Sequence, residues 1–95
     1  METKKVIFFY MNRCNRCERQ KLAIEDFLKM ADGLGYSVEE VNAAENIDLA
    51  DKYNLDDMPA IIIINGDSVH NNCSVVKFDG DIDFNLAVKE INGSF

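Results

Sequence analysis

The most constraining feature of this chain is a passage from an apolar run into a helical pattern, with two cysteines at the junction. Residues 6–11 are apolar and rich in β-branched and aromatic side chains, which predicts a buried strand. After a short polar break, apolar residues recur at the three- and four-residue steps of an amphipathic helix. They are Ala23, Ile24, Phe27, Leu28, Ala31 and Leu34. Cys14 and Cys17 form a CxxC motif between the predicted strand and the predicted helix.

The position of the two cysteines predicts a reactive thiol. A helix begins with backbone N–H groups that have no partner within the helix, and the helix dipole is positive at that end. We therefore expect at least Cys14 to lie near exposed N–H groups, where the thiolate is favoured over the thiol. Arg13 and Arg16 flank Cys14 in the sequence. We expect their positive charges to tune the thiolate in the same direction.

Length and composition limit the classes of protein to consider. The 95 residues are 47% apolar with one proline and five glycines, which predicts a single globular domain over residues 1–95. The formal net charge of −7 argues against nucleic acid or an anionic membrane as a partner. No apolar run is long enough to cross a bilayer, and the first residues lack the pattern of a signal peptide. We therefore expect a monomeric cytoplasmic protein whose thiols are kept reduced.

The middle of the chain predicts two more strands and a second helix. Gly33 and Gly35 should end the first helix, and residues 36–41 alternate loosely as a second strand, parallel to the first. Asn46 is expected to cap a short second helix. The continuous apolar run 60–64 predicts a central strand, because such a strand must be covered on both faces.

The last part of the chain predicts a hairpin and a final helix. Asn65 and Gly66 are typical of a tight hairpin turn, and residues 73–78 are the expected returning strand. Asp81 or Asp83 should cap a helix that faces the core with four apolar residues. These are Phe84, Ala87, Val88 and Ile91. The order βαβ, then α, then ββα predicts an α/β fold with a four-stranded mixed sheet and helices on both faces.

With these elements in place, the chain resembles a small protein of the thioredoxin superfamily. The likeness covers nearly the whole length and rests on the CxxC at a helix start and on a second segment, ENIDLADKYNLDDMPAIIIING. In that segment a helix ending in Lys-Tyr leads to an X-Pro step, an apolar strand and Asn-Gly. The resemblance implies a cis peptide bond before Pro59, beside the CxxC motif. It also implies that the backbone of Met58 is free to pair with an extended substrate segment.

The resemblance implies a thiol–disulfide oxidoreductase that reduces protein disulfides without a bound cofactor. Cys14 would attack a substrate disulfide as a thiolate, and Cys17 would resolve the mixed disulfide. Met58 and Pro59 would bind the substrate. The implied partners are disulfide-bearing proteins as substrates, and a thioredoxin reductase or glutathione as the electron donor.

The residues around the motif depart from both common branches of the superfamily. Thioredoxins usually carry tryptophan before the first cysteine and Gly-Pro between the two, whereas this chain has Arg13 and the pair Asn15 and Arg16. Phe8 occupies the region of the usual buried aspartate. Residues 79–83 partly match the acidic signature of glutaredoxins, so a glutathione-dependent, glutaredoxin-like enzyme is an alternative interpretation.

A zinc-binding module is the alternative from another class of protein. Its Cys3His ligand set would be Cys14, Cys17, His70 and Cys73. In the predicted fold, however, residues 60–64 carry the chain roughly 17 Å away from the CxxC motif. His70 and Cys73 follow that strand, so we expect no shared metal ion. Cys73 is then a small buried residue and His70 a loop residue.

Overall fold

The fold is described by a computed structural model that covers residues 2–67 and 72–92. Its elements in these ranges are β1 (Glu2–Tyr10), α1 (Asn15–Arg19), α2 (Lys21–Gly33), β2 (Ser37–Asn42), α3 (Ile47–Lys52), β3 (Ala60–Asp67), β4 (Asn72–Asp79) and α4 (Phe84–Asn92). The order is βαβ, then α, then ββα, so the predicted α/β architecture is confirmed. None of the described helices is both long and apolar enough to cross a membrane.

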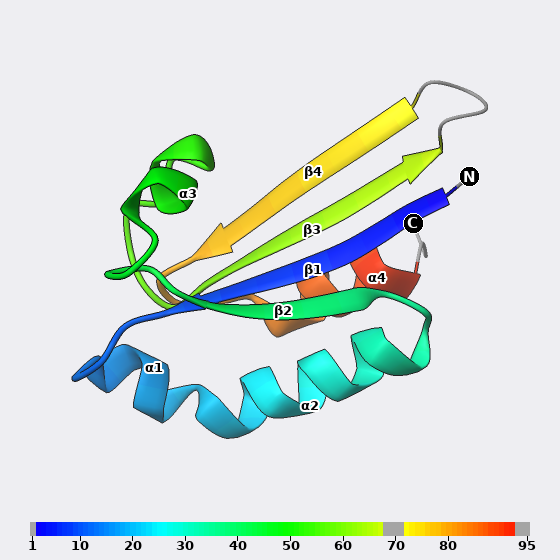
Figure 1. Cartoon of the computed structure of the whole chain (residues 1–95). Helices are drawn as coiled ribbons and strands as arrows, with labels where there is room; N and C mark the ends of the chain where they lie inside the picture. The colour runs from blue at the N-terminus through cyan, green and yellow to red at the C-terminus, as the bar shows by residue number, and fades with distance from the viewer. Residues whose placement is uncertain (1, 68–71, 93–95) are drawn as a thin grey trace.

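The strands form one mixed sheet in the order β2-β1-β3-β4 (Figure 1). β1 is parallel to β2 and antiparallel to β3, and β3 is antiparallel to β4. The parallel pair follows from the helical crossover between β1 and β2, which returns the chain to the edge where β1 began. β3 lies between β1 and β4, as its apolar run predicts, and Ile61, Ile62 and Ile63 are fully buried.

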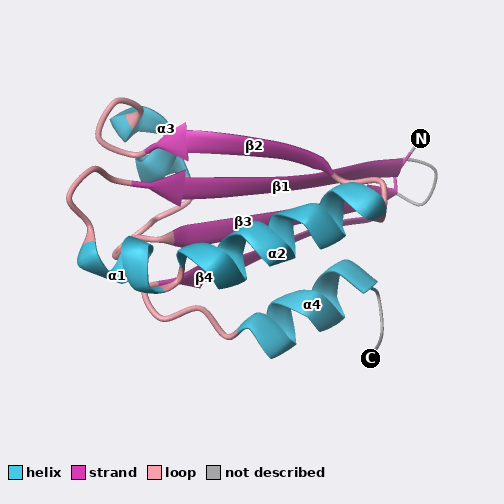
Figure 2. Cartoon of the chain, turned by 90° about the horizontal axis from the view of Figure 1, so that it is seen from below, coloured by secondary structure: helices cyan, strands magenta, loops and turns pink. Residues whose placement is uncertain are grey.

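Helices cover both faces of the sheet, as predicted. α2 and α4 lie on one face, and α3 covers one end of the other (Figures 1 and 2). Because successive strand residues point to opposite faces, the apolar side chains divide into two clusters. The larger cluster contains Val6, Ile24, Phe27, Leu28, Ala31, Tyr36, Ile61, Ile63, Ile82, Ala87 and Ile91. The smaller cluster contains Ile7, Phe9, Ala43, Ala60 and Ile62.

The first predicted helix is divided into two at Gln20. α1 is a short helix directly after Cys14, and α2 carries the buried apolar stripe. Ala23 and Leu34 were expected in that stripe but are exposed. Leu34 lies past the end of α2, and Ala23 lies at the edge of its buried face. The helix ends near Gly33 as predicted, and Gly35 adopts a φ of +91°, a conformation that favours glycine.

Of the two predicted helix caps, one makes its side-chain hydrogen bond in the structure and the other does not. Asp83 Oδ1 accepts a hydrogen bond from the Leu86 N–H at 3.2 Å, which caps α4. Asn46 occupies the N-cap position of α3, as predicted, but its side chain makes no capping hydrogen bond, so the predicted side-chain cap is wrong. Its Nδ2 donates instead to the carbonyl of Asn42 at 3.0 Å. The amide therefore closes the loop after β2, and α3 begins without a side-chain acceptor.

The predicted tight turn at Asn65 and Gly66 is also wrong. Both residues belong to β3, and Gly66 lies opposite Cys73 of β4. β3 continues through them because β1 and β4 supply backbone partners on both sides. The connection to β4 falls at 68–71, outside the described residues, and so does His70. The structure describes the backbone of Cys73 but not its side chain, so the expected burial of that side chain stays a prediction.

Candidate active site

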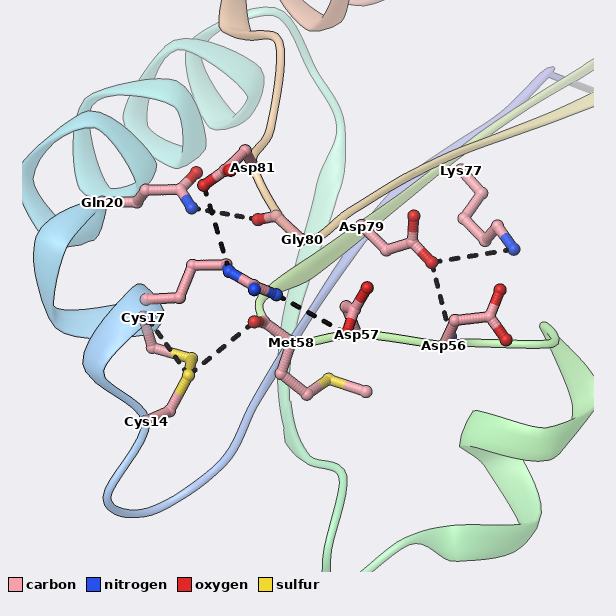
Figure 3. Close-up of polar contacts among 11 residues, drawn as sticks. Cys14, Cys17, Gln20, Asp56, Asp57, Met58, Lys77, Asp79, Gly80 and Asp81 are labelled. Atoms are coloured by element: carbon pink, nitrogen blue, oxygen red, sulfur yellow. Dashed lines mark hydrogen bonds and ion pairs between the residues drawn. A yellow bond between two sulfur atoms is a disulfide. The ribbon is translucent and has the colours of Figure 1, made fainter.

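The two cysteines of the CxxC motif form a disulfide at the start of α1 (Figure 3). Cys14 is the residue before the helix, with an extended backbone at φ −103° and ψ 105°. Cys17 lies within the helix, and the two Cα atoms are 5.2 Å apart. This separation lies in the range that a disulfide spans. The strand–helix junction therefore holds the two sulfur atoms together, as the motif predicts.

The sulfur of Cys14 lies against the first backbone N–H groups of α1. The Cys17 N–H donates a hydrogen bond to Cys14 Sγ at 3.1 Å. The Cys14 carbonyl accepts from the Glu18 N–H at 3.1 Å, which is the first bond of the helix. An N–H donor at this place stabilises a thiolate more than a thiol. The local geometry thus favours Cys14 as the nucleophile of the pair.

Two hollows meet at the disulfide, and both cysteines are half-buried. The larger hollow, which we call the Cys14 groove, has a volume of about 710 Å³. Its lining includes Cys14 and the apolar side chains of Met11, Ala43, Ile47, Ala50, Leu55 and Met58. The smaller hollow, which we call the Cys17 cleft, has a volume of about 370 Å³. Its lining includes Cys17 and the charged residues Glu18, Lys21, Glu25 and Glu40.

The loop that leads into β3 lies beside Cys14. The peptide bond between Met58 and Pro59 is cis, which confirms the expectation drawn from the resemblance. Cys14 Sγ is 3.8 Å from the Met58 carbonyl oxygen, the contact marked in Figure 3. Met58 is half-buried and lines the Cys14 groove, and within the described residues its N–H makes no hydrogen bond.

The two arginines beside Cys14 have different surroundings. Arg13 is exposed, has a φ of +58°, and lines both hollows. Arg16 instead makes ion pairs with two carboxylates. Its Nη1 lies 3.6 Å from Asp57 Oδ1, and its Nε lies 4.0 Å from Asp81 Oδ1. Of the two residues expected to tune the thiolate, Arg16 therefore pairs with carboxylates, whereas Arg13 makes no ion pair with the described residues.

Sequence reasoning missed the contacts that fasten the surrounding loops. Gln20 Nε2 donates to the Gly80 carbonyl at 2.9 Å, and Gln20 Oε1 accepts from the Ile82 N–H at 3.1 Å. The Gly80 N–H donates to the Pro59 carbonyl at 3.0 Å. A glycine two residues after the predicted strand 73–78 signals a turn there. No local pattern connects that turn with Gln20, which lies 60 residues earlier in the chain.

The placement of Cys73 excludes the Cys3His zinc site. Cys73 lies opposite Gly66, at the end of the sheet far from α1 (Figure 1). The strand from Ala60 to Gly66 extends for roughly 20 Å at the usual rise per residue, which is much longer than the span of a metal site. Within residues 2–67 and 72–92, no three ligand-type side chains are placed to hold a metal ion together. His70 lies outside these ranges.

The strand order, the CxxC disulfide at a helix start and the adjacent cis-proline together define a thioredoxin fold with a dithiol site. Solved structures of thioredoxins have the same fold. Thioredoxin of Trichomonas vaginalis is 18% identical, with a TM-score of 0.71 over 95% of this chain and 78% of that one. The oxidized form of mitochondrial thioredoxin 3 from Saccharomyces cerevisiae is 19% identical, with a TM-score of 0.72 over 95% and 77%.

A third similar structure is thioredoxin-2, described as a component of malaria parasite protein secretion machinery. It is 22% identical, with a TM-score of 0.72 over 97% of this chain and 84% of that one. No family model matches the sequence, and no curated protein matches it either. At these identities the comparisons show the fold alone, so the chemistry of the site rests on the residues of this chain.

Proposed function

We propose that this protein is a thiol–disulfide oxidoreductase that reduces disulfides in protein substrates. The proposal rests on one observation above all: the Cys17 N–H is directed at Cys14 Sγ at 3.1 Å, beside an open groove. A thioredoxin fold with a CxxC pair supports thiol–disulfide exchange in general. The finer assignment to a protein disulfide reductase is drawn from the apolar lining of the groove and the free edge of Met58.

In the first step, the Cys14 thiolate attacks one sulfur of a substrate disulfide. The substrate S–S bond breaks, a bond forms between Cys14 Sγ and that sulfur, and the other substrate sulfur leaves as a thiolate. A proton from solvent converts the leaving thiolate to a thiol. The backbone of Met58 pairs with the substrate segment, and the Cys14 groove receives the apolar side chains next to the substrate cysteine.

In the second step, Cys17 releases the substrate. The Cys17 thiol loses its proton, and the resulting thiolate attacks Cys14 Sγ, so that the mixed disulfide breaks and the second substrate thiolate leaves. The proton passes into the Cys17 cleft, which is lined by polar groups. The substrate has gained two electrons, and the protein ends with the Cys14–Cys17 disulfide, the state seen in the structure. A thioredoxin reductase or glutathione must then return two electrons.

The overall charge of the chain favours a protein reductase as the electron donor over glutathione. Glutathione carries a net negative charge, and the net charge of the chain is −7, whereas in the lining of the Cys14 groove Asp56 and Asp57 are balanced by Arg13 and Arg16. A glutaredoxin-like enzyme is the second candidate, because the exposed Arg13 lines both hollows and suits a carboxylate of glutathione.

The proposed function is tested by insulin reduction in the presence of dithiothreitol. The unaltered protein should accelerate insulin precipitation, and Cys14→Ser should abolish the acceleration. In a separate reaction without dithiothreitol, the reduced Cys17→Ser variant should accumulate a mixed disulfide with the substrate, visible by mass spectrometry. Retention of full activity by Cys14→Ser would refute the assignment of the nucleophile. Reduction of the oxidised protein by thioredoxin reductase or by glutathione then separates the two candidate donors.

A further inference from the structure

We infer that Arg16 is a positioning residue: it holds the Met58 peptide in place against Cys14, and it does not tune the thiolate. This inference rests on the proposed disulfide exchange, since it concerns how the substrate meets Cys14. Arg16 was expected from the sequence to stabilise the thiolate by its charge. Its contacts lead to a different role.

The ion pairs of Arg16 connect α1 with two loops. Arg16 lies next to Cys17 in α1, and its Nη1 is 3.6 Å from Asp57 Oδ1. Asp57 directly precedes Met58, whose carbonyl oxygen lies 3.8 Å from Cys14 Sγ. Arg16 therefore links the helix that carries the cysteines to the loop that carries the substrate-pairing edge. The dashed lines that reach Asp57 and Met58 in Figure 3 mark these two contacts.

The second loop, after β4, completes the arrangement. Arg16 Nε lies 4.0 Å from Asp81 Oδ1. Gly80 lies beside both side chains, since an added Cβ would be in ordinary van der Waals contact, 3.5 Å from Arg16 Nη1 and 3.5 Å from Asp57 Cβ. Gln20 fastens the same loop through the Gly80 carbonyl at 2.9 Å. We call these five residues, Arg16, Gln20, Asp57, Gly80 and Asp81, the Arg16 brace.

The brace is expected to act as a network. The side chains of Arg16, Asp57 and Asp81 are 37%, 62% and 85% exposed, and ion pairs at such exposure are individually weak. Arg16 Nε itself is enclosed by protein and has no hydrogen bond within the described residues. Its position is thus restrained by the two carboxylates together, and ion pairs that share one cation can contribute more as a network than they do separately.

The same geometry explains why Arg16 should not tune the thiolate. Its single positive charge is shared between two carboxylates, so little net field remains at the sulfur of Cys14. Loss of the side chain should instead release the loop that carries Met58. A protein substrate that pairs with this loop would then be aligned less well, whereas a small disulfide that meets only Cys14 would not be affected in the same way.

The test compares Arg16→Met with Arg19→Met. Arg19 lies in the same short helix, is exposed, and makes no ion pair with the described residues, so its substitution removes the same charge without touching the brace. For Arg16→Met we expect KM for insulin to rise about threefold to tenfold. The rate constant with a small aromatic disulfide and the pH titration of the Cys14 thiolate should change no more than they do in Arg19→Met. Arg16→Lys keeps the positive charge, so its KM for insulin should lie between those of Arg16→Met and the unaltered protein.

Two results would overturn the inference. In the first, Arg16→Met loses the same fraction of its activity with insulin and with the small disulfide, and the titration midpoint of its Cys14 thiolate is higher. That result would mean that Arg16 tunes the thiolate. The other is a KM no higher than that of Arg19→Met. An unaltered protein that is inactive with both disulfides would refute the proposed function instead, so the two failures are distinguishable.

A second pair of variants keeps the inference testable if Arg16→Met does not fold. Asp57→Asn and Asp81→Asn remove the carboxylates of the brace and leave Arg16 in place. Their double variant should raise KM for insulin. Because it also frees the positive charge of Arg16, its rate with the small disulfide is compared with that of the unaltered protein at a pH where the Cys14 thiolate is fully formed in both, and there the two rates should agree. If instead the double variant shows the KM of the unaltered protein, the ion pairs have no role in positioning.

Discussion

Replacing Gln20 by alanine should destabilise the protein measurably, because one side chain makes two hydrogen bonds between distant parts of the chain. Nε2 donates to the Gly80 carbonyl at 2.9 Å, and Oε1 accepts from the Ile82 N–H at 3.1 Å. Both bonds are partly buried, and Ile82 is 8% exposed. At about 0.5–1.5 kcal/mol for each bond, the free energy of unfolding should fall by roughly 1–3 kcal/mol.

The assay is urea unfolding of the oxidised protein, followed by circular dichroism. For a domain of this size, each kcal/mol corresponds to a shift of the thermal midpoint of about 4–8 °C, so heating gives an independent check. Gln20→Ala should shift the urea midpoint and leave the slope of the transition unchanged, because the fold and the surface exposed on unfolding are the same.

Gln20→Glu is the matched control. A carboxylate oxygen still accepts from the Ile82 N–H, but the other oxygen faces the Gly80 carbonyl, and these two acceptors repel, so the loss should be at least as large as that of Gln20→Ala. A change below about 0.3 kcal/mol for Gln20→Ala would refute the reasoning, because it would mean that water replaces both bonds at no cost.

Four further substitutions test the rest of the fold by urea unfolding. Ile62→Ala should lower the free energy of unfolding by about 2–5 kcal/mol because the side chain is fully buried. Leu22→Ala, at a site 77% exposed, should change it by less than about 0.5 kcal/mol. Similar losses at both sites would contradict the described burial. Asp83→Ala removes the cap of α4 and should cost about 1 kcal/mol, and no loss would mean that the bond to Leu86 is not formed in solution. Arg13→Gly should change the free energy of unfolding by less than about 0.5 kcal/mol. Glycine removes the steric strain of a φ of +58°, and this gain offsets the entropy that glycine adds to the unfolded chain. A loss above about 1 kcal/mol would argue against that backbone conformation.

Local patterns in the sequence were sufficient for most of the elements. Apolar periodicity placed α2 and α4, and the run at 60–64 identified β3 as a central strand. Each of these signals depends only on residues that are close together in the sequence. The cis peptide bond before Pro59 came from the resemblance and not from the residues themselves, because the sequence alone establishes only a turn there.

The errors and omissions have two physical causes. Asn65 and Gly66 favour a turn in isolation, but β1 and β4 lie on either side of them and extend the strand. Gln20 was also missed because of tertiary contacts, since its two partners lie on a loop far along the chain. Asn46 depends instead on a local contact, because its amide donates to the Asn42 carbonyl four residues earlier and makes no bond to α3.

The most direct test of the central claim is the pH titration of Cys14 in the reduced protein. A variant with Cys17→Ser and Cys73→Ser leaves one thiol and keeps the backbone N–H of residue 17, so ultraviolet absorbance of the thiolate reports Cys14 alone. We expect the pKa of the Cys14 thiol to lie below the ordinary value of about 8.5, because the N–H at 3.1 Å and the start of α1 stabilise the charged form. A pKa at or above about 8.5 would contradict the claim that the helix start activates this sulfur.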